Sequence, residues 1–195
     1  MSHPISRFPV PTLAEMPDDI RERIAAVQEK AGFVPNVFLV LARRPEEFRA
    51  FFAYHDALME KRGGLTPAQR EMIVVATSAA NQCQYCVIAH GALLRVRSKN
   101  PLLADQVATN YRKADLSAAD KALLDFAMQV ALAAHTLGDA EVERMKAHGF
   151  SEEDVWDAAA IAAFFGMSNR LANAADMRPN DEFYTLARNV TAKPQ

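Results

Sequence analysis

The sequence contains few of the residues that define several common classes of protein. Only two of its 195 residues are cysteine, too few for the disulfide framework of a small secreted domain. The formal net charge is −2, so no basic field favours nucleic acid as a partner. No apolar run approaches the roughly 18 residues that a membrane-spanning helix requires. We therefore expect a protein that binds neither nucleic acid nor a membrane.

The N-terminus also lacks the basic segment and apolar core of a secretory signal. We therefore expect a cytoplasmic protein, and in that reducing compartment a close cysteine pair is usually catalytic, redox-active or metal-binding. Half of the residues are hydrophobic and 24% are charged, as in an ordinary globular protein. The length fits a single domain over residues 1–195.

The hydrophobic pattern predicts an all-α fold. The sequence shows no alternating runs rich in valine, isoleucine and threonine, and its seven glycines form almost no hairpin dipeptides. Four prolines predict an extended N-terminal arm over residues 1–17, and Asn36 is expected to cap a short helix. Helices are expected over 18–31, 37–42, 45–61, 67–80, 87–96, 117–134, 151–175 and 181–190, with shorter ones after 101 and before 149.

Two of these helices begin in a similar way. Residues 64–71 and 115–122 share a pattern of a capping residue followed by a long apolar helix. This similarity suggests an internal duplication within the helical bundle.

The two cysteines lie close together in the sequence and are followed by a histidine. On a helix, Cys83, Cys86 and His90 stand at positions i, i+3 and i+7, along one stripe. Asn81-Gln82 indicates a break after the preceding helix, which places Cys83 near a helix N-terminus. Unpaired backbone N–H groups at that end stabilise a thiolate and lower the pKa of a thiol. We therefore expect a thiol redox site.

Glu71 lies twelve residues before Cys83, between two and three turns from the end of the preceding helix. At that position its side chain can face either solvent or the cysteine helix. If it faces the cysteine helix, the carboxylate and His90 can form a proton relay for a thiol.

The spacing Glu-x11-Cys-x2-Cys-x3-His, formed by Glu71, Cys83, Cys86 and His90, resembles the active-site signature of the alkyl hydroperoxidase D (AhpD) family. That family lies within the carboxymuconolactone decarboxylase superfamily. The proline-rich arm and residues 38–45, 65–71 and 169–172 are similar to its peroxidase-related branch. The resemblance implies an AhpD-like helical bundle that forms a homo-oligomer. It also implies a peroxidase cycle without haem, flavin or metal.

The resemblance further implies a role for each residue. Cys86 would attack the hydroperoxide, and Cys83 would form the disulfide with it and be exposed to a dithiol reductant. Glu71 and His90 would relay protons. AhpD proper has a histidine just before the second cysteine, whereas this chain has Tyr85, a poor base that can donate a hydrogen bond. Tyr85 is therefore a secondary site residue.

Several other interpretations of the cysteine pair remain open. The protein could be a disulfide oxidoreductase, a redox sensor or partner-binding module, or a carboxymuconolactone decarboxylase-like enzyme, although the last does not need a cysteine pair. The cysteines could also be plain core residues. A zinc site is a further alternative, with four potential ligands: Glu71, Cys83, Cys86 and His90.

Two further polar residues stand next to apolar ones. His55 falls in the phenylalanine stripe of the helix over 45–61, and we expect a core or interface histidine there. Arg170 follows an apolar run and is expected to form a buried ion pair or to contribute to an oligomer interface.

Overall fold

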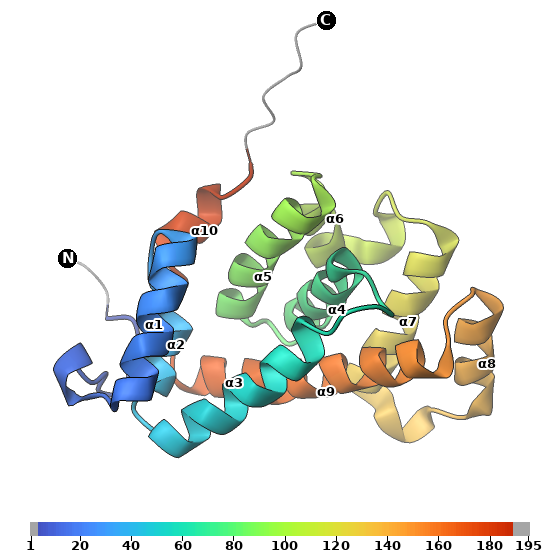
Figure 1. Ribbon diagram of the computed structural model, residues 1–195. Helices are drawn as coiled ribbons and strands as arrows, with labels where there is room; N and C mark the ends of the chain where they lie inside the picture. The colour runs from blue at the N-terminus through green and yellow to red at the C-terminus, as the bar shows by residue number, and fades with distance from the viewer. Residues whose placement is uncertain (1–3, 189–195) are drawn as a thin grey trace, which may run out of the picture.

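The computed structural model describes residues 4–188, and every regular element in that range is helical (Figure 1). The all-α fold is thereby confirmed. Single 3₁₀ turns occur at Leu13–Glu15, Tyr111–Lys113 and Ala134–Thr136. The α-helices are α1 (Asp18–Ala31), α2 (Asn36–Leu41), α3 (Pro45–Met59), α4 (Pro67–Ala80), α5 (Gln84–Ser98), α6 (Leu103–Asn110), α7 (Ala118–Ala133), α8 (Asp139–Ala147), α9 (Glu152–Ala174) and α10 (Asp181–Thr185).

Helix α4 lies at the centre of the molecule. All of its residues from 70 to 78 are buried, which is typical of a helix surrounded by other helices. It packs against α5, α6, α7 and α9, and α9 runs along the base of the bundle (Figure 1). A carboxylate on such a helix, as at Glu71, must find partners inside the protein.

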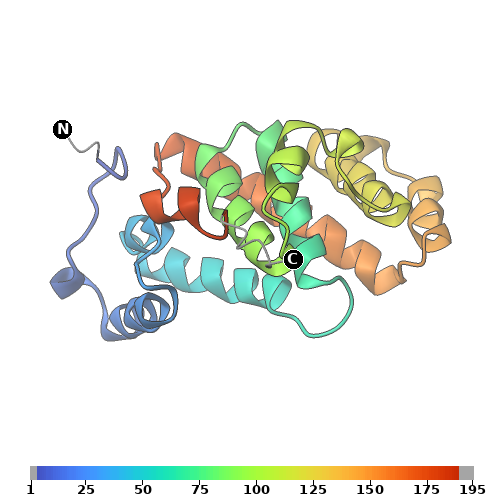
Figure 2. The same cartoon turned by 90° about the horizontal axis from the view of Figure 1, so that it is seen from above.

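A second, smaller core forms between α1, α2 and α3. Ile20 and Ile24 of α1 pack there with Phe48 and Phe52 of α3. Figure 2 shows this block next to the N-terminal arm, whereas α7 and α8 lie at the far end of the molecule. Among residues 4–188, no helix combines the length and the hydropathy needed to cross a membrane.

The N-terminal arm is tied to the end of α9. The backbone N–H of Arg7 donates to the carbonyl of Ala175 over 2.8 Å, and Ile5 accepts from Arg178 over 3.1 Å. The expected arm over residues 1–17 is not extended throughout, because residues 13–15 form a 3₁₀ turn. Glu15 stabilises this turn by accepting hydrogen bonds from the N–H and hydroxyl of Thr12. Residues 1–3 lie outside the described range.

The structure corrects two of the predicted helix ends. Asn36 does not cap α2, because its side chain instead donates to the carbonyl of Arg178 over 2.8 Å. Helix α10 ends at Thr185 because Leu186 leaves the helical conformation and Ala187 adopts a positive φ of 55°. The last part of the predicted 181–190 helix, residues 189–190, lies outside the described range.

The two helix starts that suggested a duplication are both capped as predicted. Thr66 accepts from the backbone N–H of Gln69, and Ser117 accepts from that of Asp120. The two first turns also touch, since the Gln69 amide donates to the Asp120 carboxylate over 2.9 Å. The duplication itself stays a prediction.

Candidate active site

Helices α4 and α5 form an antiparallel hairpin around the cysteine pair. Asn81 ends α4, and Gln82 takes a positive φ of 52° that reverses the chain. Cys83 is the N-cap residue of α5, and its backbone N–H donates to the carbonyl of Ser78 over 3.0 Å. The predicted break at Asn81-Gln82, and with it the position of Cys83 at a helix N-terminus, is confirmed.

Both cysteine side chains are free thiols inside the protein. Cys83 is 0% exposed and Cys86 is 2% exposed. The sulfur of Cys83 accepts a hydrogen bond from the backbone N–H of Cys86 over 3.4 Å. The expectation that Cys83 is exposed to an external reductant is wrong for the chain as described, because the N-cap position turns its sulfur inward over the first turn of α5.

The two thiols differ in how easily they ionise. A hydrogen bond from the Cys86 side chain, assisted by backbone N–H groups of α5, lowers the pKa of the Cys83 thiol. The same hydrogen bond, together with burial and the charge on Cys83, raises the pKa of the Cys86 thiol well above its usual value. Of the two thiols, Cys83 is therefore the one that ionises more readily.

Glu71 faces the cysteine helix rather than solvent. Its carboxylate is almost completely buried and accepts from Nδ1 of His90 over 2.8 Å. Arg97 lies two turns further along α5, and its Nε is 3.2 Å from the other carboxylate oxygen. A carboxylate on Nδ1 fixes the proton there, which leaves Nε2 of His90 as the atom that can accept another proton. Arg97 was not foreseen, although its spacing of seven residues from His90 places both on one helix face.

Tyr85 connects α5 to α2. Its hydroxyl accepts from the backbone N–H of Val37 over 3.2 Å, and its side chain is 5% exposed. Burial raises the pKa of the Tyr85 phenol further above its usual value. The phenol is thus even less ionised at neutral pH than an ordinary tyrosine, and so less available as a base.

Asn169 of α9 is a site residue that sequence reasoning missed. It is fully buried, and its amide nitrogen donates to the hydroxyl of Ser78 over 2.9 Å. Its side chain also contacts both sulfurs, where hydrogen bonding lowers the pKa of each thiol. The neighbouring Arg170 is exposed and donates to the carbonyl of Gly166 over 2.6 Å, so the expected buried ion pair is absent from the described residues.

A cavity of about 200 Å³ lies beside the cysteine pair. Cys86, Tyr85 and His90 of α5 line it, whereas Cys83 does not contribute to its described wall. Most of the remaining wall is apolar and comes from α1, α2, α3 and α9. The polar exceptions include His55 and Asp56 of α3, so the histidine expected in the core or at an interface lies beside this cavity.

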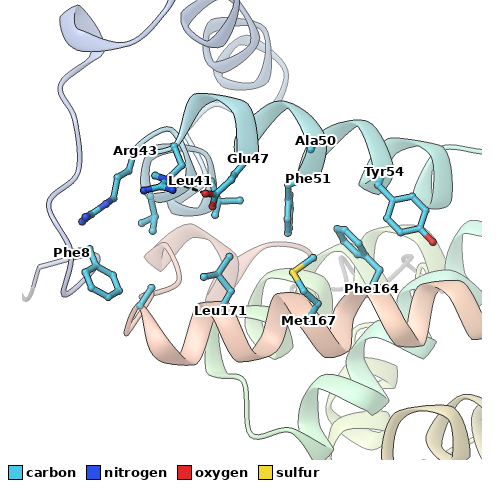
Figure 3. Close-up of a pocket in the computed structure, with 13 residues that line it drawn as sticks. Phe8, Leu41, Arg43, Glu47, Ala50, Phe51, Tyr54, Phe164, Met167 and Leu171 are labelled. Atoms are coloured by element: carbon cyan, nitrogen blue, oxygen red, sulfur yellow. Dashed lines mark hydrogen bonds and ion pairs between the residues drawn. The ribbon is translucent and has the colours of Figure 1, made fainter. Parts of the chain in front are cut away.

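A wider groove of about 640 Å³ runs between α3 and α9 (Figure 3). Phe8 of the N-terminal arm lies at one end and Tyr54 at the other, and Met167 and Leu171 form much of its floor. Phe51 belongs to the walls of both this groove and the cysteine cavity. One aromatic side chain therefore borders both a solvent-exposed apolar surface and the cavity that Cys86 lines.

The arrangement does not form a metal centre in the described part of the chain. Within residues 4–188, no group of three or more His, Cys, Asp or Glu side chains is placed to hold an ion. The four residues considered for zinc separate into a thiol pair and a carboxylate–imidazole pair. The chemistry available is that of a dithiol and of a hydrogen-bonded carboxylate–imidazole pair.

An all-helical bundle with a buried Cys-x-x-Cys pair beside a carboxylate–histidine pair defines a narrow class of protein, and comparisons with known proteins agree with it. The model of the carboxymuconolactone decarboxylase family matches residues 45–102. A peroxidase-related protein from Ralstonia eutropha JMP134, described as an alkylhydroperoxidase AhpD core, is 66% identical with a TM-score of 0.95. The alignment covers 96% of this chain and 99% of that chain.

A peroxidase-related protein from Silicibacter sp. TM1040 is 38% identical with a TM-score of 0.90, over 94% of this chain and 96% of that one. The debrominase Bmp8, at 19% identity and a TM-score of 0.73 over 94% of this chain and 95% of that one, shares the fold. No match was found among curated proteins. The chain belongs to the carboxymuconolactone decarboxylase family, among its AhpD-like, peroxidase-related members.

Proposed function

We propose that this protein is a thiol-dependent peroxidase that reduces hydroperoxides through a Cys83–Cys86 dithiol/disulfide cycle. The observation that carries the proposal is the placement of Cys86 and His90 in the wall of one small cavity. Cys83 lies directly behind Cys86, within hydrogen-bonding distance of its backbone. A substrate in the cavity thus meets one sulfur while the second waits next to it.

The first step oxidises Cys86. Its thiol proton passes to His90, which Glu71 orients, and the thiolate attacks the terminal oxygen of the hydroperoxide. The O–O bond breaks and Cys86 becomes a sulfenic acid. The leaving alkoxide accepts the proton from His90 and departs as an alcohol. The sulfur loses two electrons and the peroxide gains them. The apolar cavity walls favour organic hydroperoxides.

The second step forms the disulfide. The Cys83 thiol, whose sulfur also accepts hydrogen bonds from backbone N–H groups of α5, attacks the sulfenic sulfur, and its proton leaves with the sulfenic hydroxyl as water. A dithiol reductant then regenerates both thiols by exchange. Because Cys86 lines the cavity and Cys83 does not, a small dithiol reaches the Cys86 sulfur first. A cycle that requires reduced thiols fits the cytoplasm, which is the location we propose.

We also propose that the chain works as a homo-oligomer. The groove between α3 and α9 leaves Tyr54, Met167 and Leu171 substantially exposed, and apolar surfaces of this kind often mark association sites. Light scattering coupled to gel filtration would measure the mass in solution. A mass of about 21.5 kDa, that of one chain, would contradict this part of the proposal.

The peroxidase cycle is tested by exposing wild type, Cys83→Ser and Cys86→Ser to one equivalent of cumene hydroperoxide. Thiol titration and intact mass are then recorded. We expect wild type to lose both thiols and about 2 Da, and Cys83→Ser to trap a sulfenic acid. A sulfenic acid that forms only in Cys86→Ser would exchange the two roles. Thiols that resist peroxide but exchange with a small disulfide would replace the peroxidase with a disulfide oxidoreductase.

A further inference from the structure

A second carboxylate–histidine pair lines the cysteine cavity from α3. Nδ1 of His55 lies 3.0 Å from a carboxylate oxygen of Asp56, its neighbour on α3. The other oxygen of Asp56 accepts from Arg23 of α1 over 2.7 Å. All three residues line the cavity that contains Cys86. None of them belongs to the cysteine motif, and the proposed cycle assigns them no role.

This group repeats the arrangement of Glu71, His90 and Arg97. In both, a carboxylate holds Nδ1 of a histidine and an arginine holds the carboxylate. The rings of His55 and His90 approach to 6.5 Å between centroids, with Phe165 packed close to both. Two imidazoles thus border one small space, each held by its own carboxylate.

The position of Asp56 decides which atom of His55 meets the cavity. A carboxylate accepts the Nδ1 proton, so the neutral ring keeps its lone pair on Nε2. Burial lowers the pKa of His55 below its ordinary value, which keeps the ring neutral near neutral pH. His55 is therefore a hydrogen-bond acceptor in a mostly apolar wall.

We propose that His55 is a catalytic residue that accepts a hydrogen bond from the terminal O–H of the hydroperoxide. This inference rests on the proposed peroxidase function and deepens it. The hydrogen bond holds the oxygen that bears the proton against the sulfur of Cys86. That proton stays on the same oxygen, which becomes the sulfenic hydroxyl, while His90 supplies the proton of the leaving alkoxide. The site is then specific for compounds with a free O–O–H group.

The placement also explains how the chain manages without the histidine that AhpD proper has before its second cysteine. Tyr85 occupies that position here, and its hydroxyl is engaged with the backbone of Val37. His55 supplies a second imidazole to the cavity from a different helix. Asp56 and Arg23 act as positioning residues, because they contact the ring or its carboxylate and not the sulfur.

The test compares two reagents on one thiol. In the Cys83→Ser background, the rate of Cys86 oxidation by cumene hydroperoxide is measured beside its rate of alkylation by iodoacetamide. Both reactions need the thiolate, but only the hydroperoxide has an O–H to be held. We expect His55→Leu to slow the peroxide reaction about tenfold or more, as for a lost buried hydrogen bond, with alkylation changed less than about twofold.

Two further variants guard against a purely structural effect. His55→Gln keeps an acceptor near the position of Nε2, and we expect it to recover much of the peroxide rate. His135→Leu removes an exposed histidine from a remote turn and should change neither rate. Equal slowing of both reactions in His55→Leu, or no slowing of either, would overturn the role of His55. A Cys83→Ser protein that cumene hydroperoxide does not oxidise at all would instead overturn the peroxidase function.

Discussion

The two walls of the cysteine cavity carry the same kind of residues at different depths. On the α4–α5 wall, the side chains of Glu71 and His90 are 2% and 12% exposed. On the α3 wall, those of Asp56 and His55 are 37% and 25% exposed. Charge interactions gain strength as water is excluded, and so does the cost of leaving one partner unpaired. The more buried pair, Glu71 and His90, therefore contributes to the stability of the fold, and we call its side of the cavity the inner wall. The more exposed pair, Asp56 and His55, can be altered with a smaller loss of stability, and we call its side the outer wall.

Glu71→Gln is expected to produce the largest effect. It removes the charge between His90 and Arg97, of which Arg97 keeps some contact with water. We expect the loss of this buried ion pair to lower the unfolding free energy by about 2–4 kcal/mol. Peroxide reduction should fall about a hundredfold, because the amide no longer orients His90 as a base. Denaturant unfolding and peroxide consumption measure the two losses.

Asp56→Asn is the matched control for Glu71→Gln, because it neutralises the corresponding carboxylate beside His55. The Asp56 carboxylate is more than a third exposed, so its loss should cost no more than about 1 kcal/mol. Equal losses of stability in the two variants would show that burial does not distinguish the walls. An unchanged peroxide rate in Glu71→Gln would remove Glu71 from the proton relay.

Tyr85→Phe affects the connection between α5 and α2. Its hydroxyl is the acceptor for the backbone N–H of Val37 in α2, and without it that N–H loses its partner. We expect a loss of about 1–2 kcal/mol in unfolding free energy, with the peroxide rate kept within about threefold. Tyr54→Phe keeps the aromatic ring that the groove exposes and removes only a hydroxyl, so it serves as the control and should leave both quantities unchanged. A tenfold loss of rate at unchanged stability would instead give Tyr85 a catalytic role.

The sequence predicted the inner wall better than the outer one for a physical reason. Cys83, Cys86 and His90 lie on consecutive turns of one helix, and Glu71 lies on the helix next to it in the hairpin. Helical periodicity and the break at Asn81-Gln82 are enough to align such residues. The helix starts could be predicted in the same way, since their capping residues are local in sequence.

The α3 wall of the cavity and the surroundings of the two thiols depend on contacts that local patterns do not encode. Arg23 reaches Asp56 across 33 positions, and Asn169 reaches Ser78 across 91. These pairings follow from how α1 packs on α3 and how α9 crosses α4, and no spacing rule fixes either. The inward direction of the Cys83 sulfur was missed for a related reason, because it depends on the N-cap geometry and not on the position of the residue along the helix.

The smallest expected effect concerns the pH dependence of stability. Burial lowers the pKa of His55 in the folded protein, while in the unfolded chain it is about 6.5. The contribution of His55 is therefore fully present above pH 6.5 and is lost as the pH falls through the folded-state pKa. The unfolding free energy of wild type should rise with pH in the window just below 6.5, and His55→Gln should rise less.

The difference between the two proteins isolates His55, because the other titratable groups are common to both. Several of them surround its ring and set its charge environment: Arg23, Asp56, Glu60, Glu71, Tyr85, Cys86 and His90. Denaturant unfolding at half-unit steps from pH 5 to pH 8 provides the curves. Parallel curves would mean that His55 titrates alike in the folded and unfolded chains, and the outer wall would then be as open to water as an ordinary surface.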